Sequence, residues 1–108
     1  MAESYLERIF AALIKAEGLP EPIREFKLCD DRRWRGDFVW LKPRRVLVEI
    51  EGGIWLGAKG RHTNGKGFLE DCHKYNEAAL RGFLVIRVCK EHINDGSALE
   101  WLKRALND

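Results

Sequence analysis

Three acidic residues, divided between two neighbouring predicted strands, constrain this chain more than any other feature of its sequence. Asp37 lies in one short apolar segment, and Glu49 and Glu51 lie in the next. Side chains alternate between the two faces of a strand, so Glu49 and Glu51 are expected on the same face. An antiparallel hairpin that sets Asp37 opposite Glu49 would bring all three carboxylates together. Carboxylates this close raise one another's pKa unless a cation lies between them, so the pattern predicts a divalent-metal site.

The remaining elements follow from apolar periodicity, helix caps and turn residues. Ser4 with Glu7, and Ser97 with Glu100, form the spacing of a capping box at a helix start. The predicted elements are a helix from Ser4 to Gly18, strands over 23–28, 36–41 and 45–51, a helix over 68–81, a strand over 83–88, and a helix from Ser97 to about Leu106. Lys42–Arg44 forms the turn of the acidic hairpin, and the glycine-rich residues 52–67 predict a loop. The order α-β-β-β-α-β-α predicts an α/β fold with a mixed sheet of about four strands flanked by helices.

Composition indicates a soluble globular protein. With 108 residues, 45% of them hydrophobic and 33% charged, residues 1–108 are expected to form one domain. The net charge of +2 is too small to indicate a nucleic-acid partner by itself. Basic residues flank the acidic hairpin on both sides, which suits a polyanionic substrate, although a solvated surface of mixed charge is the ordinary alternative.

Cysteine usage and hydropathy point to the cytoplasm. Three cysteines cannot form a complete set of disulfides, and Cys72, His73 and His62 match no familiar zinc spacing. The N-terminus has no signal-peptide pattern, and no apolar stretch is long enough to span a bilayer. We therefore expect a soluble, cytoplasmic protein (nuclear in a eukaryote) with reduced thiols and no membrane contact.

The element order and the acids resemble the PD-(D/E)XK nuclease superfamily, whose restriction-endonuclease-like core is a mixed sheet flanked by helices. Asp37 matches the first acid of that motif and Glu49 the second, while Glu51 stands where the lysine usually lies. More narrowly, the chain resembles the branch of very-short-patch repair endonucleases and small phage or mobile-element nucleases. The stretches that carry this resemblance are residues 48–53, Trp55, His62, Asp71 with Lys74–Asn76, and Gly82–Phe83 leading into Arg87.

The resemblance implies that Asp37, Glu49 and the Ile50 carbonyl hold Mg²⁺, for which Mn²⁺ is expected to substitute. Glu51 would be a third ligand or the group that orients and deprotonates the attacking water. The structural alternatives are an Asp37 that pairs with Arg35 and a Glu51 that faces solvent at a strand end.

Lys74 is the candidate for the missing lysine, presented from the second predicted helix, with Asp71 one turn earlier to position it. The alternative is an exposed ion pair between these two residues. His62 is a candidate for contacting the scissile phosphate or acting as general acid, but a lone histidine in a loop is more often a surface residue.

DNA contacts are expected from cations near the acids, together with an aromatic side chain that can stack on a base. These residues are Arg32, Arg33, Trp34, Arg35, Lys59, Arg61, Lys66 and Arg87. For Arg87, balancing the charge of the acidic cluster is the structural alternative.

The expected function is that of a Mg²⁺-dependent DNA endonuclease in repair, recombination or phage DNA processing, in a bacterium or a phage-infected host. It would act on duplex or branched DNA, as a homodimer or a monomer, without a small-molecule cofactor. Two alternatives remain: a nucleic-acid-binding module that has lost cleavage, and a subunit of a larger recombination or transposition complex. For the second, Trp101 on the final helix is the candidate contact.

Overall fold

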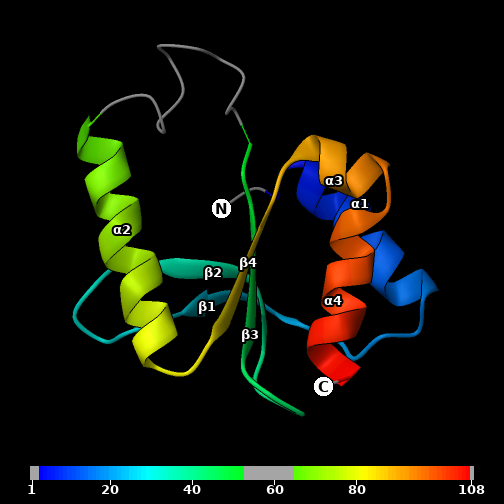
Figure 1. The fold of residues 1–108 in the computed structure, drawn as a ribbon, viewed down its shortest axis with the longest axis horizontal. Coiled ribbons are helices and arrows are strands. Elements are labelled where there is room, and N and C mark those ends of the chain that lie inside the picture. Colours follow the sequence, from blue (N-terminus) through cyan, green and yellow to red (C-terminus); the bar gives the residue numbers. More distant parts are fainter. Residues whose placement is uncertain (1–2, 53–64, 108) are drawn as a thin grey trace.

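A four-stranded mixed sheet forms the centre of the protein (Figure 1). The computed structural model describes residues 3–52 and 65–107. Its elements in chain order are α1 (Tyr5–Ala16), β1 (Ile23–Lys27), β2 (Arg35–Trp40), β3 (Val46–Ile50), α2 (Gly65–Leu80), β4 (Leu84–Val88), α3 (Lys90–Asn94) and α4 (Ser97–Asn107). The strands lie in the order β1-β2-β3-β4, with antiparallel pairing from β1 to β3 and parallel pairing of β4 with β3. The predicted α/β class and mixed sheet are confirmed, with one additional helix.

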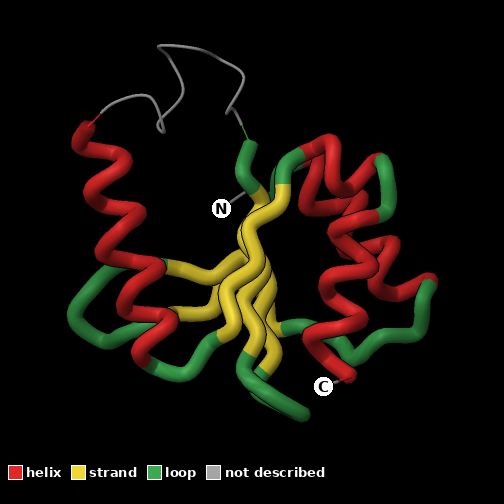
Figure 2. Tube along the Cα trace, viewed as in Figure 1, coloured by secondary structure: helices red, strands yellow, loops and turns green. Residues whose placement is uncertain are grey.

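Helices cover both faces of the sheet. The sheet is seen nearly edge-on in Figures 1 and 2, with α2 on one side and α1, α3 and α4 on the other. The larger core lies on the side of the three helices and includes Phe10, Phe38 and Trp40, each at most 2% exposed. The smaller core, on the α2 side, includes Val39, Leu47, Ala78 and Phe83.

Strand alternation decides which face each residue of β3 serves. Val46 and Val48 belong to the larger core, whereas Leu47 belongs to the smaller one. Glu49 and Glu51 continue the alternation of Leu47, and both line a cavity beside α2. The prediction that these two acids share a face is therefore confirmed.

The predicted capping boxes form only in part. Ser4 caps α1 by accepting the Glu7 N–H at 3.1 Å, but the Glu7 carboxylate binds Arg24 instead of returning to the cap. At α4 the box prediction is wrong, because both the N–H and the hydroxyl of Ser97 donate to Asp95 Oδ1. Asp95, two residues before Ser97, therefore accepts the first N–H of this helix, and Glu100 takes no part in a capping box.

Two helix predictions need correction. α2 begins at Gly65 rather than at 68, so the predicted loop 52–67 is too long. Glycine penalises a helix chiefly in its interior, and Gly65 and Gly67 lie in the first turn. The short helix α3 was not predicted, because five residues carry little periodicity. In the described parts of the chain, no helix has the length and apolar character needed to cross a membrane.

Candidate active site

The acidic hairpin has the predicted register. Phe38 pairs with Val48 and Trp40 with Val46, and the same register continued sets Asp37 opposite Glu49. At this pair, the two strands are joined by hydrogen bonds from backbone N–H groups to side-chain carboxylates. The Asp37 N–H donates to Glu49 Oε2 at 2.8 Å, and the Ile50 N–H donates to Asp37 Oδ2 at 2.9 Å. Each of the two acids is therefore fixed by the backbone of the opposite strand.

The three acids line one cavity of about 400 Å³ between the sheet and α2. The acidic residues around this cavity are Glu7, Glu25, Asp37, Glu49, Glu51, Glu70 and Asp71. Its cationic residues are Arg33, Arg35 and Lys74. The structure thus places Asp37, Glu49 and Glu51 around one cavity. Among the described residues, however, the three acids whose carboxylate oxygens all lie within 4.8 Å of one another are Glu7, Glu25 and Asp37.

Lys74 reaches the acids from α2. Its Nζ lies 2.6 Å from Glu49 Oε1, and its side chain is only 15% exposed. The neighbouring Tyr75 hydroxyl donates to the same oxygen at 3.0 Å. Lys74 therefore forms a largely buried ion pair with Glu49, in contrast to the exposed ion pair with Asp71 given as the structural alternative.

Glu51 is bound by an arginine. Arg87 donates from Nε to Glu51 Oε2 at 3.1 Å and from Nη2 to Glu51 Oε1 at 3.0 Å, and the same Nη2 lies 3.7 Å from buried Asp71. The hydrogen bonds that Arg87 donates to Glu51 raise the pKa of Arg87. Arg87 therefore balances charge in the acidic cluster, in agreement with the structural alternative.

The pKa of Asp37 is raised, and unlike Glu51 at the other end of the cavity, Asp37 is not bound by Arg87 in the contacts described above. Burial and the neighbouring Glu49 charge raise the pKa of Asp37 to about 7, against the opposing hydrogen bond from Ile50. Burial, followed by the Glu49 and Glu51 charges, also raises the pKa of Tyr75, so its hydroxyl stays protonated and acts as a donor. A positive charge beside Asp37 would stabilise its ionised form and lower its pKa.

A second group of acids lies on the other side of Asp37. Carboxylate oxygens of Glu7, Glu25 and Asp37 all lie within 4.8 Å of one another. Glu25 was missed at the sequence level, and its backbone has a positive φ of 52°. The observed β1–β2 register, in which Arg24 pairs with Phe38 and Phe26 with Gly36, places Glu25 opposite Asp37, and the sequence carries no signal of this pairing.

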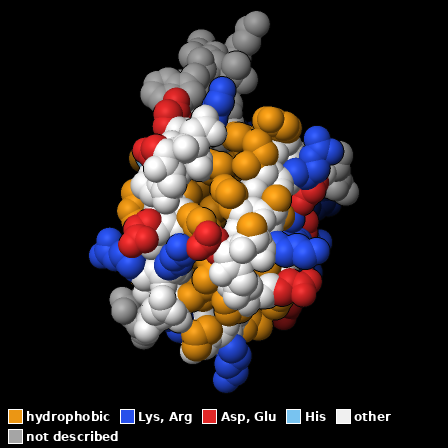
Figure 3. Space-filling model, turned by 90° about the vertical axis from the view of Figure 1, so that its right-hand side faces the viewer, with side chains coloured by type: hydrophobic (Ala, Val, Ile, Leu, Met, Phe, Trp, Pro, Cys, Tyr) orange, Lys and Arg blue, Asp and Glu red, His pale blue; other side chains and the backbone are white. Residues whose placement is uncertain are grey.

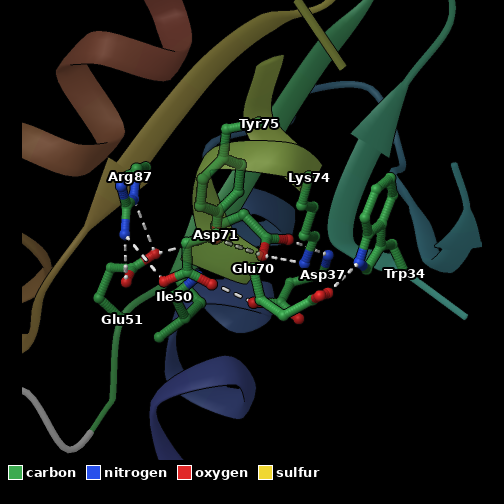
Figure 4. Close-up of polar contacts among 10 residues, drawn as sticks. Trp34, Asp37, Ile50, Glu51, Glu70, Asp71, Lys74, Tyr75 and Arg87 are labelled. Carbon is green, nitrogen blue, oxygen red and sulfur yellow. Dashed lines mark hydrogen bonds and ion pairs between the residues drawn. The ribbon is translucent and has the colours of Figure 1, made fainter. Parts of the chain in front are cut away.

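The predicted DNA contacts are only partly gathered around the cavity. Arg32, Arg33 and Arg35 are exposed, and the last two line the cavity. The Trp34 indole N–H donates to Glu70 Oε2 at 3.1 Å, while the Arg32 guanidinium lies 5.2 Å from its ring centre. Figure 4 shows Trp34 and Asp37 at one end of the site and Arg87 with Glu51 at the other.

Of the remaining predicted residues, the structure describes Lys66, which does not line the cavity. Lys66 is exposed in the first turn of α2. Lys59, Arg61 and His62, together with Trp55, lie outside the described residues.

Comparisons with protein-family models, with curated proteins and with solved structures found no match for this chain.

Proposed function

We propose that this protein is a Mg²⁺-dependent DNA endonuclease with a restriction-endonuclease-like core of the PD-(D/E)XK type. One observation carries the proposal: Asp37 and Glu49 are interlocked across β2 and β3, and the Lys74 ammonium lies 2.6 Å from Glu49 in the same cavity. Two acids with a nearby lysine are the characteristic residues of that motif, and here the lysine comes from a helix.

The donor set suits a hard divalent cation. Mg²⁺ prefers oxygen ligands, which Asp37 and Glu49 offer at facing positions of the hairpin. The Ile50 carbonyl accepts the Gly52 N–H at 3.2 Å and keeps a second lone pair for a cation. The pKa of Asp37 is raised first by burial and then by the Glu49 charge, and a cation between the two carboxylates would offset both effects.

The residues around this pair have separate tasks. When bound, Mg²⁺ supplies Lewis-acid charge to a phosphoryl oxygen and lowers the pKa of a coordinated water. Lys74 moves from Glu49 to the scissile phosphate, where its ammonium stabilises developing negative charge. Arg33 and Arg35 at the cavity hold the neighbouring phosphates and fix the register of the strand.

The decisive experiment is cleavage of plasmid and branched DNA with Mg²⁺ or Mn²⁺. We expect cutting by the wild-type protein and none by Asp37→Asn or Glu49→Gln, with DNA binding retained because each change removes negative charge. Lys74→Met should slow cutting strongly, whereas Lys15→Met, at an exposed position of α1, should leave it unchanged. Metal-dependent cutting that survives both acid substitutions would overturn the site.

One observation favours the alternative of a subunit in a larger complex. On the face that carries α1 and α4, hydrophobic side chains form a band between charged ones (Figure 3). Trp101 packs on His92 with ring centres 4.9 Å apart and lines a hollow of about 350 Å³ together with Leu84, which is 41% exposed. A wild-type protein that binds DNA but cuts nothing alone would support this alternative.

A further inference from the structure

Tyr75 lies between the two glutamates of β3 and its extension. Its hydroxyl is 3.0 Å from Glu49 Oε1 and 3.3 Å from Glu51 Oε2. The Arg87 guanidinium lies over the Tyr75 ring, 4.4 Å from its centre. In Figure 4, Tyr75 stands between the Arg87–Glu51 pair on one side and Lys74 with Asp37 on the other.

The contacts divide the two glutamates by their partners. Both oxygens of Glu51 accept hydrogen bonds from Arg87, so a cation already matches its charge. Glu49 Oε1 accepts from Lys74 and Tyr75, and its Oε2 accepts the Asp37 N–H. A phenol has one proton, and the shorter distance assigns it to Glu49.

We propose that Tyr75 is a positioning residue that holds Glu49 beside Asp37, where the two carboxylates would share a cation, and that Glu51 holds the Arg87 guanidinium against the Tyr75 ring instead of binding the metal. This inference rests on the proposed function, because it concerns the cation expected between Asp37 and Glu49. It replaces the sequence-level expectation that Glu51 is a ligand or general base.

The tyrosine hydroxyl matters most once a bound cation has repelled the Lys74 ammonium from Glu49, which requires no phosphate. Glu49 Oε1 would then keep only Tyr75 of its two hydrogen-bond donors. Without the hydroxyl, the carboxylate could rotate away from Asp37. Loss of a hydrogen bond that orients a metal ligand typically weakens metal affinity about 10–100-fold.

Mn²⁺ titration calorimetry without DNA tests the proposal independently of cleavage. Tyr75→Phe removes the hydroxyl and keeps the ring under Arg87, and we expect it to weaken Mn²⁺ binding about 10-fold or more. Tyr5→Phe is the matched control, because Tyr5 is 70% exposed on α1, and its affinity should equal that of the wild type. Glu49→Gln should abolish binding, whereas Glu51→Gln should stay within a few-fold of the wild type.

Each outcome decides a separate statement. Equal Mn²⁺ affinity for Tyr75→Phe and the wild type, with or without lower thermal stability, overturns the role of Tyr75. A loss for Glu51→Gln as large as that for Glu49→Gln makes Glu51 a ligand and overturns its role of holding Arg87 against Tyr75. If Tyr75→Phe does not fold, the comparison of the two glutamine variants decides alone. Wild-type protein that binds no Mn²⁺ overturns the proposed function, and this inference with it.

Discussion

At the scale of single residues, Asp37 takes part in two interactions. It holds the Ile50 N–H across the hairpin, and it faces Glu49 in a partly buried cavity. Burial and the Glu49 charge raise its pKa from 3.8 to about 7. The ionised form is therefore costly in the folded protein. A cation bound as proposed would offset that cost, so we expect stability, pH and metal binding to be coupled.

This coupling predicts the pH dependence of stability. Between about pH 4 and pH 7, folded Asp37 keeps a proton that the unfolded chain has lost. The free energy of unfolding should therefore fall as pH rises through that range and level off above about 7. Asp37→Asn should remove this component. Urea unfolding at pH 5 and pH 8 in EDTA, for both proteins, measures the difference.

Mg²⁺ at pH 8 should restore stability to the wild type and not to Asp37→Asn, since it binds the ionised carboxylate. A fall in stability of equal size in both proteins would contradict the raised pKa of Asp37.

At the scale of elements, close packing between β2 and β3 supports the cavity. Gly36 is buried next to Asp37, and a Cβ there would lie 2.6 Å from Leu47 Cδ1 and 2.7 Å from Val39 Cγ2. Both neighbours belong to the smaller core under α2. A side chain at position 36 would therefore displace the layer that supports the acids.

We predict that Gly36→Ala lowers the free energy of unfolding by about 1–3 kcal/mol, the usual cost of overpacking a core. Gly65→Ala is the control, because a Cβ there meets nothing within 4 Å. Denaturant unfolding of both variants provides the comparison. If Gly36→Ala and Gly65→Ala have the same free energy of unfolding, Leu47 and Val39 can move aside at no cost, and the prediction is wrong.

The elements also show what the sequence could and could not predict. Alternation in β3 was sufficient to put Glu49 and Glu51 on one face, and the short turn set the register with Asp37. Glu25 could not be predicted, because its approach to Asp37 depends on a positive φ that β1 gives no sign of. The different hydrogen-bond partners of Glu49 and Glu51 were also beyond the sequence, since Tyr75 and Arg87 reach them from elements distant in the chain.

At the scale of the whole molecule, the sheet separates two surfaces. One side, beneath α2, holds the acidic cavity with Arg33 and Arg35 at its wall. The other side is covered by α1, α3 and α4 (Figure 1). The net charge of +2 is small, so under the proposed function the attraction to DNA would come from local cations rather than from the overall charge.

This asymmetry predicts which arginines govern DNA affinity. Arg33→Ala and Arg35→Ala should each weaken binding and lower the salt dependence by about one ion, as expected for a lost phosphate contact. Arg104→Ala, on α4, should change neither. Fluorescence anisotropy in EDTA across several salt concentrations measures both quantities. If all three substitutions change the affinity and its salt dependence equally, DNA does not bind specifically at the acidic cavity.

The central claim is that Asp37 and Glu49 together hold one divalent cation, and anomalous diffraction from crystals grown with Mn²⁺ tests it most directly. We predict a single strong peak within coordination distance of carboxylate oxygens from both residues, with Glu51 still bound to Arg87. A peak held by Glu7 and Glu25 without Glu49, or none at this cavity, would contradict the account.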